Sequence, residues 1–430
     1  MADRHLEQLL SILKSSGADA WEVTDTNEWG WEFYFIRHRL DQHRTKAVDS
    51  FSVKVYKKLE DGKFLGSASA KIAPDASEEE MRRTVEGLCR DASYVRNPFY
   101  TLNKPAEAET AETAPVDMKA VCADFLRAMR SLPETETEDL NSYEIFVSEI
   151  RRRFLNSEGI DVTDVYPSSM VEAVVNARKD GHEIELYRFY QSGACDAEQL
   201  SHDLSETLRF GRDKLITTDT PALGTADVVL STDAAKAVYD YFIARLSTAA
   251  IYRRISDWEI GKSIADQYTG DKVTVRALRE LPNSSSNGAY DREGAPVRDL
   301  LLMDAGVPVH FHGSRQFSQY LGLEDSFIAS NFIVSGGKES AEEIRCGDHL
   351  EIMEFSDFQV DHVTGDIAGE IRLAYLHQGG KTISVSGGSV SGNMNELVKK
   401  MQFSAENRQY DCMLIPAVTR LNGATVTGAV

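Results

Sequence analysis

Two carboxylates flank an arginine in the segment AYDREGAP, where Asp291 and Glu293 stand beside Gly294. Carboxylates placed this closely can hold a water molecule or a substrate amine, and they can act as a general acid or base. The same residues are also typical of a structural turn, in which side-chain oxygens accept backbone hydrogen bonds and glycine allows a tight bend. Composition alone favours the turn. The segment VTGD at 363–366 leaves the same two interpretations open.

A pair of histidines offers metal chemistry. His310 and His312 are separated by one residue, so on a strand they would share a face, about 7 Å apart. Two imidazoles at that spacing can bind one metal ion if a third ligand comes from elsewhere, and the candidates for it are His349, His362 and Cys412. Histidines that serve only the structure or the surface are the simpler explanation, because spacing alone is weak evidence.

Familiar catalytic motifs are absent from the sequence. It has no GxSxG, GxxxxGK[ST] or GxGxxG pattern, and no helix that carries two histidines and a glutamate. The pair His182-Glu183 follows a turn and opens an alternating strand, where it cannot form a helical zinc motif. The cysteines are widely spaced without a CxxC pair, which indicates reduced thiols and no structural zinc. They are Cys89, Cys122, Cys195, Cys346 and Cys412.

Composition narrows the class of protein. The 430 residues are 42% hydrophobic and 27% charged, which is typical of a folded chain and excludes a disordered one. The formal charge of −21 disfavours binding to nucleic acid or to anionic membranes. The first ten residues carry charges of both signs, and no stretch approaches the roughly 18 apolar residues that span a bilayer. We therefore expect a cytoplasmic protein without nucleic-acid or membrane partners.

Periodicity predicts the same order of elements twice in the first half, separated by a proline-bounded linker at 104–115. The first set is a helix at 5–16, strands at 31–37, 51–57 and 63–71, and a helix after the N-cap Ser77. The second set is a helix at 118–129, strands at 143–154, 169–176 and 183–190, and a helix at 196–214. An internal duplication of 1–103 and 116–215 would explain this order.

The pattern changes near residue 221. A strand at 228–230 leads into a helix from 231 to about 253, and short strands with glycine-rich turns follow from 272, with a late helix near 395–402. The chain is therefore predicted to have an α+β fold in two domains. Residues 1–220 would form an N-terminal α/β domain of helix-flanked antiparallel hairpins, and residues 221–430 a C-terminal β-rich domain with few helices.

Four ordered blocks of the second half resemble the TldD/PmbA family. They are IYRRISDWEIGKSIA (251–265), AYDREGAPVRDLLLMDAGVPVHF (289–311), SNFIVSGGKESAEEI (330–344) and DHVTGDIAGEIRLAYLHQGGK (361–381). Each block alone is unspecific, whereas their order and spacing over about the last 200 residues are specific. Members of this family are described as modulators of DNA gyrase and as metal-dependent peptidases.

The zinc motif of the family's peptidase branch has no counterpart here. That branch carries a His-Glu-x-x-x-His helix after the strand that opens the C-terminal domain, whereas the matching helix here has Tyr239, Asp240 and Ala244. A late cysteine contributes to the metal in that branch and Cys412 lies in the matching stretch, but a single thiolate is not a zinc site. The resemblance therefore implies the PmbA branch, also called TldE, whose members act as a non-zinc subunit beside a TldD-type peptidase.

The resemblance also implies a peptide cleft in the C-terminal domain. The acidic-glycine segment and the TGD-type turn match two motifs of the family, and we carry their residues over as cleft residues and not as catalysts. Between residues 306 and 331 the chain is shorter than many relatives. The family pattern therefore says little about the wall of the cleft that this segment would form. The expected cleft residues are Tyr290, Asp291, Glu293, Gly294, Asn331, Thr364, Gly365 and Asp366.

The sequence thus predicts a PmbA/TldE-like subunit of a TldD/PmbA-type metallopeptidase assembly. It would bind peptide or unfolded protein and support proteolysis by a zinc-bearing partner, as a homodimer or as a heterodimer with a TldD-type zinc peptidase. No cofactor is expected in this chain, since the zinc would belong to the partner. The alternatives are a self-sufficient metallopeptidase built on His310 and His312, and a non-proteolytic protein that acts on gyrase or a toxin–antitoxin system.

Overall fold

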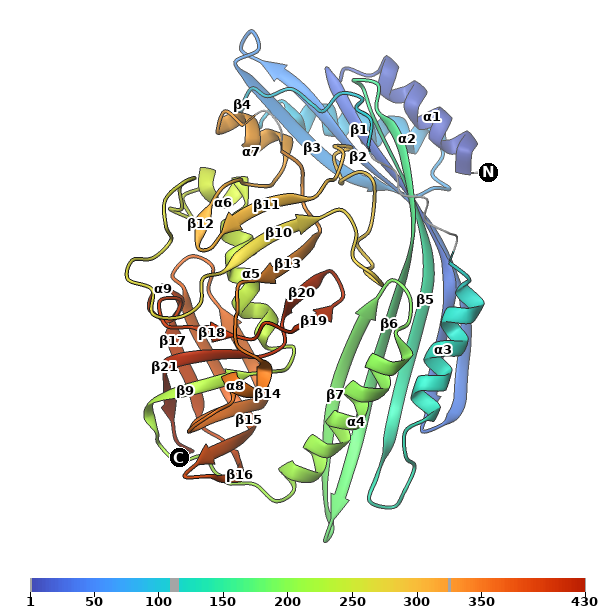
Figure 1. The fold of residues 1–430 in the computed structure, drawn as a ribbon. Helices are drawn as coiled ribbons and strands as arrows, with labels where there is room; N and C mark the ends of the chain where they lie inside the picture. Colours follow the sequence, from blue (N-terminus) through green and yellow to red (C-terminus); the bar gives the residue numbers. More distant parts are fainter. Residues whose placement is uncertain (1, 109–115, 324–325, 430) are drawn as a thin grey trace.

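The computed structural model describes residues 2–108, 116–323 and 326–429 and has an α+β fold (Figure 1). One seven-stranded sheet occupies the first half of the chain, and a six-stranded and an eight-stranded sheet occupy the second half. The predicted fold class is confirmed. The predicted linker at 104–115 lies partly outside the described residues.

The seven-stranded sheet has the order β4-β3-β2-β1-β5-β6-β7, with antiparallel pairing throughout. Its central strands run side by side from Glu22 opposite Asn156 to Ile36 opposite Ser142. Several strands are longer than predicted because neighbouring strands continue to pair beyond the apolar stretches. The strands are β1 (Ala20–Ile36), β2 (Arg39–Leu59), β3 (Phe64–Ile72), β4 (Asn97–Pro98), β5 (Glu138–Asn156), β6 (Asp161–Lys179) and β7 (His182–Ser192).

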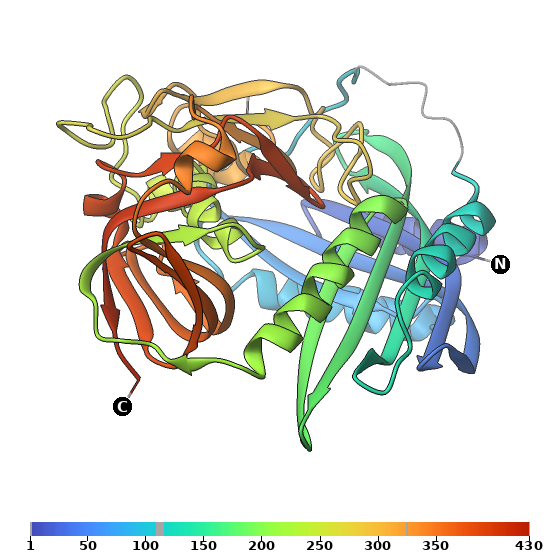
Figure 2. The same ribbon diagram turned by 60° about the horizontal axis from the view of Figure 1, so that its bottom comes forward.

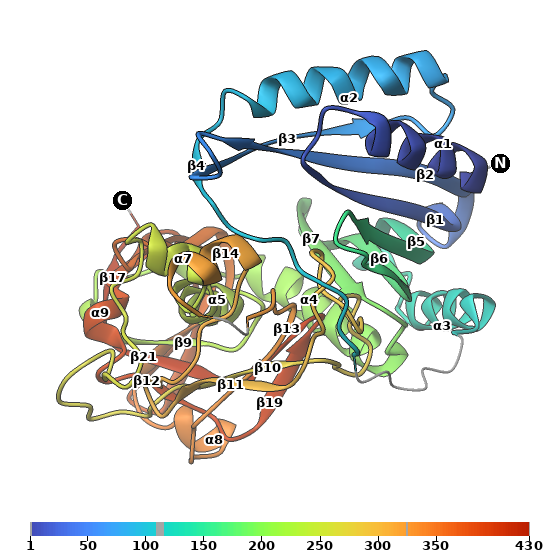
Figure 3. The same ribbon diagram turned by 90° about the horizontal axis from the view of Figure 1, so that it is seen from above.

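Two pairs of helices pack on this sheet and bury separate cores. Helices α1 (Ala2–Ser15) and α2 (Glu78–Ala92) lie over β1, β2 and β3 (Figure 3), and Leu9 and Val85 pack there against Val23. Helices α3 (Met118–Arg130) and α4 (Ala197–Lys214) lie side by side (Figure 2), where Phe125 and Leu204 meet β5 and β6. A capping box between Ser77 and Glu80 starts α2, as the sequence predicts.

The order helix, three strands, helix occurs twice, as α1-β1-β2-β3-α2 and as α3-β5-β6-β7-α4. The two meanders meet where β1 pairs with β5. A duplication of 1–103 and 116–215 would produce this arrangement, but the duplication and the boundary at 220 remain predictions. Strand β8 (Thr218–Asp219) already pairs with β16 of the second half.

Five strands of the second half close into a barrel. The eight-stranded sheet has the order β14-β9-β21-β17-β15-β16-β8, with β18 on β21, and the extra pairing of β14 with β15 completes the ring. The six-stranded sheet has the order β12-β11-β10-β13-β20-β19. The strands are β9 (Gly224–Leu230), β10 (Thr274–Leu278), β11 (Leu300–Asp304), β12 (Val307–Pro308), β13 (Asn331–Ser335), β14 (His349–Val360), β15 (Asp366–Gln378), β16 (Lys381–Ser386), β17 (Ser389–Asn393), β18 (Gln402–Phe403), β19 (Asn407–Tyr410), β20 (Met413–Pro416) and β21 (Thr419–Thr427).

The helix predicted from 231 to 253 is wrong as a single element. The chain forms α5 (Ala235–Arg245) and then α6 (Thr248–Tyr252), because Ser247 takes an extended conformation and caps α6. The amide of Thr248 donates to the carbonyl of His312, so a tertiary contact holds this break. The remaining helices are short: α7 (Arg315–Tyr320), α8 (Ala341–Ile344) and α9 (Met394–Leu397).

Among the described residues, none of the helices combines the length and the hydropathy needed to cross a bilayer. The cytoplasmic location stays a prediction.

Candidate functional site

A cavity of about 310 Å³, the edge-strand cavity, is lined by residues of β7 and α4 on one side and of β19 and β20 on the other. Figure 1 shows where these four elements lie. Both β7 and β19 end their sheets: within the described residues, β7 pairs only with β6, and β19 only with β20. An edge strand offers unpaired backbone groups, which an extended peptide can satisfy by adding a strand. The cavity therefore lies between two edges that could take a peptide backbone.

The lining combines an apolar floor with a charged rim. Leu200, Leu204 and Phe210 on one side of α4 form part of the floor. At the rim, Arg408 forms ion pairs with Asp203 and, at 3.8 Å, with Glu206. Burial raises the pKa of Asp203, an effect that Arg408 opposes. The charged lining residues are Asp196, Asp203, Glu206, Asp233 and Asp411 on the acidic side, and Arg188, Lys236 and Arg408 on the basic side.

Cys412 lines this cavity but is not an activated thiol. Burial and the neighbouring carboxylate of Asp411 raise its pKa, so the thiol stays protonated at neutral pH. The lining residues that the structure describes include no histidine that could serve as its base. The edge-strand cavity is thus suited to binding and not to nucleophilic chemistry.

The acidic-glycine segment lies away from this cavity. Asp291 is only 6% exposed and accepts three backbone hydrogen bonds, from Glu293 at 2.8 Å, Ala295 at 2.9 Å and Ile328 at 2.8 Å. Gly294 has φ +73°, and a Cβ there would lie 2.8 Å from the ring of Phe154. This geometry is that of a structural turn. Any contact of the segment with a peptide stays a prediction.

Glu293 of the same segment is a second, partly buried carboxyl, and it interacts electrostatically with Glu22 of β1. Its Oε2 accepts the amide of Arg315 at 2.8 Å. Burial raises the pKa of Glu293 to about 7, and the nearby carboxyls of Glu22 and Asp291 add to the effect. Glu22 itself accepts the hydroxyl of Tyr56 at 2.7 Å. Glu293 thus holds a proton up to about neutral pH, and neither Glu293 nor Glu22 lines the edge-strand cavity.

Hydrogen bonds fix the backbone of Tyr290 and the side chain of Asn331. The guanidinium of Arg152 donates to the carbonyls of Tyr290 at 2.8 Å and of Asp291 at 2.9 Å. Asn331 is fully buried, and its amide group accepts from Ser284 Oγ at 2.6 Å and donates to Asn287 Oδ1 at 3.0 Å. Neither residue lines the edge-strand cavity.

The TGD-type turn joins β14 to β15 on the surface. Asp361 caps it by accepting the amides of Val363 and Thr364, and Gly365 has φ +80°. Asn393 donates to the Asp366 carboxylate at 2.7 Å. The turn is anchored to α5, because buried Arg245 donates to the carbonyls of His362 and Val363. Thr364, Gly365 and Asp366 thus form a braced turn outside the edge-strand cavity.

The helix that matches the family's zinc motif is α5. Tyr239 is fully buried and its hydroxyl lies 2.6 Å from Thr419 Oγ1. Asp240 is exposed, with one carboxylate oxygen 3.4 Å from Nε2 of His362. Ala244 has no ligand atom, so these three positions offer one carboxylate and no imidazole to a metal ion.

The structure does not bring His310 and His312 together. The strand expected to carry both ends at Pro308. His310 is exposed with Nδ1 2.8 Å from the carbonyl of Leu301, whereas His312 is buried with Nε2 3.3 Å from the carbonyl of Ile243. Burial lowers the pKa of His312 to about 4. Among the described residues, no group with metal-binding geometry contains either histidine, His362 or Cys412.

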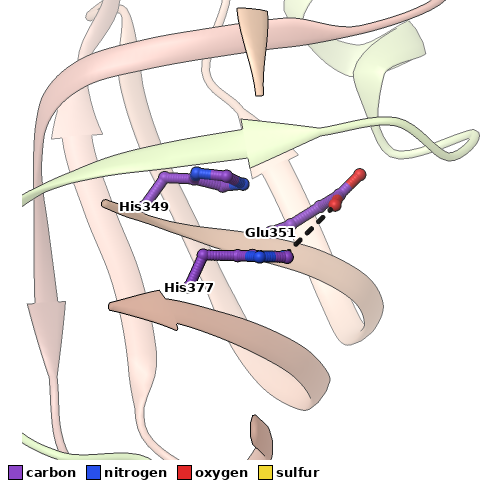
Figure 4. Close-up of side chains that lie close together, drawn as sticks. All are labelled: His349, Glu351 and His377. Carbon is purple, nitrogen blue, oxygen red and sulfur yellow. Dashed lines mark ion pairs between the residues drawn. The ribbon is translucent and has the colours of Figure 1, made fainter. Parts of the chain in front are cut away.

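Two other groups of side chains do have metal-binding geometry. His349, considered from the sequence as a third ligand for His310 and His312, lies instead with Glu351 and His377 (Figure 4). The second group is His202, Asp203 and Glu206 on α4. Sequence reasoning missed Glu351 and His377. The one available signal was that His349 and Glu351, two residues apart, share a face of a strand.

Residues 223–428 match the family of PmbA/TldA metallopeptidase C-terminal domains. The C-terminal half belongs to the PmbA/TldD family. A curated relative of the whole chain is an uncharacterised protein of Methanocaldococcus jannaschii, 22% identical over 376 residues that cover 83% of this chain and 86% of that protein. The resemblance stated from the four sequence blocks is confirmed.

Solved structures share the fold over nearly the whole chain. TldE from Thermococcus kodakarensis has a TM-score of 0.79 at 16% identity, covering 99% of this chain and 100% of that one. A candidate modulator of a DNA gyrase from Thermotoga maritima has a TM-score of 0.78 at 16% identity, with the same coverage. Another, from Bacteroides thetaiotaomicron, has a TM-score of 0.79 at 15% identity, covering 99% and 98%. At these identities the likeness shows the PmbA/TldD-type fold alone.

Proposed function

We propose that this chain is a peptide-binding subunit of a TldD/PmbA-type metallopeptidase assembly and that it lacks the helical zinc motif of the peptidase branch. The observation that carries the proposal is the edge-strand cavity, which lies between the free edges of β7 and β19. A peptide that enters as an added strand forms backbone hydrogen bonds with these edges. Its side chains alternate between the apolar floor on α4 and the charged rim.

The composition of α5 supports a partner that supplies the hydrolytic zinc. The C-terminal half belongs to a family described as metallopeptidases, yet Tyr239, Asp240 and Ala244 stand where the peptidase branch has its motif. In the proposed assembly, a heterodimer with a TldD-type peptidase, the partner's zinc activates the water that attacks the peptide bond. This chain holds the substrate in an extended conformation. The likeness to TldE supports such an assembly.

The rim indicates which peptides fit best. Acidic side chains outnumber basic ones around the edge-strand cavity, and the chain as a whole has a formal charge of −21. Peptides with neutral or basic side chains are therefore the proposed substrates, because acidic peptides would be repelled.

A cavity-filling variant tests the binding site. Thr232 lines the cavity at a loop before α5, so Thr232→Trp should obstruct it while leaving the sheets intact. We expect at least a tenfold loss of affinity for a fluorescent, neutral or basic extended peptide, measured by anisotropy. The matched control is Thr137→Trp, an exposed loop position outside the cavity, which should change the affinity less than twofold. Equal effects of the two variants would contradict this site.

A reconstitution tests the division of labour. The purified chain alone should not cleave peptides, whereas its mixture with a zinc-bearing TldD-type partner should, and Thr232→Trp should lower the activity of the mixture. Peptide cleavage by this chain without any partner would overturn the proposal.

A further inference from the structure

Three side chains from two neighbouring strands of the barrel meet on one face. His349 and His377 are direct cross-strand partners on β14 and β15, and Glu351 lies two residues further along β14. The rings stack with centroids 4.3 Å apart, and both point toward Glu351 (Figure 4). One ligand atom from each of the three side chains lies within 4.8 Å of the other two.

Both imidazoles keep one nitrogen without a hydrogen-bond partner. The Nε2 atoms of His349 and His377 are buried and make no hydrogen bond. Their other nitrogens are occupied: Nδ1 of His349 lies 2.9 Å from the carbonyl of Gly347, and Nδ1 of His377 lies 3.0 Å from Thr382 Oγ1. A proton on Nδ1 of His349, donated to that carbonyl, leaves the Nε2 lone pair free. A hydrogen bond made by the ring nitrogen that faces away from the metal orients a metal-binding histidine.

The carboxylate completes the set. Glu351 is 7% exposed, and its Oε1 accepts from Ser231 Oγ at 2.7 Å and from Arg345 Nε at 2.8 Å. Its Oε2 faces Nε2 of His377 at 3.7 Å, which is too long for a hydrogen bond. One oxygen is therefore anchored, and the other is directed at the two unpaired nitrogens.

We propose that His349, Glu351 and His377 bind a divalent transition metal ion, with zinc as the ion to test first. Two imidazole nitrogens and one carboxylate oxygen are a donor set that zinc and its first-row neighbours accept. Because imidazole lone pairs lie in the ring plane and the rings are only 16° from parallel, the two rings would have to tilt toward a common point to bind one ion.

The site opens toward the contact between the two halves of the chain. Glu351 and His377 line a second cavity of about 560 Å³, which shares Glu206, Thr232 and Arg408 with the edge-strand cavity. An ion held by three protein ligands keeps an open coordination position for water or a carboxylate oxygen. This site is separate from α5, and its three ligands come from two strands, so the lack of a helical motif does not bear on it.

The second group with metal-binding geometry is already occupied by protein contacts. On α4, Arg408 pairs with Asp203 and Glu206, and Nε2 of His202 lies 3.5 Å from Glu206. His202 is also exposed. This histidine is therefore the matched control for adventitious binding near the same cavity.

Titration of the full chain with zinc tests the proposal. After treatment with EDTA and removal of the chelator, calorimetry should show one equivalent of bound zinc for the wild type and for His202→Ala. His377→Gln and His349→Asn should weaken binding at least a hundredfold. Bound cobalt should give a visible absorption band in the wild type and in His202→Ala. It should give none in His377→Gln or His349→Asn. Circular dichroism checks that each variant is folded.

Three results would overturn the site: no zinc binding by the wild type, unchanged binding in both cluster variants, or loss of binding in His202→Ala. Should one cluster variant fail to fold, the other still decides. The measurement uses this chain without partner or peptide. Its failure is therefore distinguishable from failure of the proposed peptide-binding function, which is measured by anisotropy.

Discussion

Asp291 and Glu351 are both buried carboxylates, at 6% and 7% exposure, yet they lie in contrasting surroundings. Both oxygens of Asp291 are used by backbone amides within its own segment and from Ile328. Glu351 has one oxygen anchored by two donors and the other directed toward imidazole nitrogens that lack a partner. Both groups are carboxylates and their burial is nearly equal, so the degree of hydrogen-bond saturation is what separates a structural carboxylate from a candidate ligand.

The largest expected effect comes from removing the saturated carboxylate. Asp291→Ala leaves three backbone donors without their acceptor, and each unsatisfied buried donor costs about 1–3 kcal/mol. We expect the free energy of unfolding, measured with urea, to fall by on the order of 4 kcal/mol. Asp366→Ala, in an exposed turn, is the control and should cost less than about 1 kcal/mol. Similar losses of stability in both variants would show that the three hydrogen bonds to Asp291 do not give it a structural role.

The group of His349, Glu351 and His377 has incomplete hydrogen bonding. Substitution there should therefore cost little stability, and a bound metal ion should add stability. His377→Gln should change the free energy of unfolding by less than about 1 kcal/mol without metal, since Nε2 of His377 makes no hydrogen bond and lies 3.7 Å from Glu351 Oε2. Zinc at a hundredfold excess over its dissociation constant should stabilise the wild type by about 2.7 kcal/mol and leave the variant unchanged. A variant that zinc stabilises as much as the wild type would show that the cluster is not the ligand set.

A third carboxyl, the partly buried Glu293, should make the stability of the protein depend on pH. Its pKa is raised from 4.5 to about 7 in the folded chain, so the folded state binds this proton more tightly than the unfolded state. The contribution of Glu293 to the free energy of unfolding is complete below pH 4.5 and is lost as the pH rises through about 7. Glu293→Gln keeps an acceptor for Arg315 and should abolish this slope, a difference of about 2 kcal/mol between pH 5 and pH 8. Parallel stability curves of variant and wild type over this range would refute the assignment.

The smallest effect is expected at Cys412. Its raised pKa and partial burial predict slower alkylation at pH 8 than at exposed Cys346, read by mass spectrometry of labelled peptides. Cys412→Ala should alter the free energy of unfolding by at most about 1 kcal/mol. Preferential labelling of Cys412 would indicate an activated thiol and a chemical role for the edge-strand cavity.

Local patterns predicted most elements of the first half. The N-caps Ser77 and Asp196 begin α2 and α4 where expected, and the alternating segments became strands of one antiparallel sheet. The break between α5 and α6 was not predictable, because the amide of Thr248 bonds to His312, sixty-four residues away in the chain. The separation of His310 from His312 has a similar origin. The strand that would have aligned them ends early, at Pro308.

What the sequence determined by itself is local or compositional: the charge, the caps, the meanders, the family blocks and the lack of a zinc helix on α5. The tertiary structure alone decided the candidate metal site. The turn pairs Asp361 with Asp366, and counting back without irregularity would place Gln378 opposite His349. Register shifts along β14 place His377 there instead. Since a slip of one residue turns a side chain to the other face of a sheet, such pairing depends on bulges that local sequence does not specify.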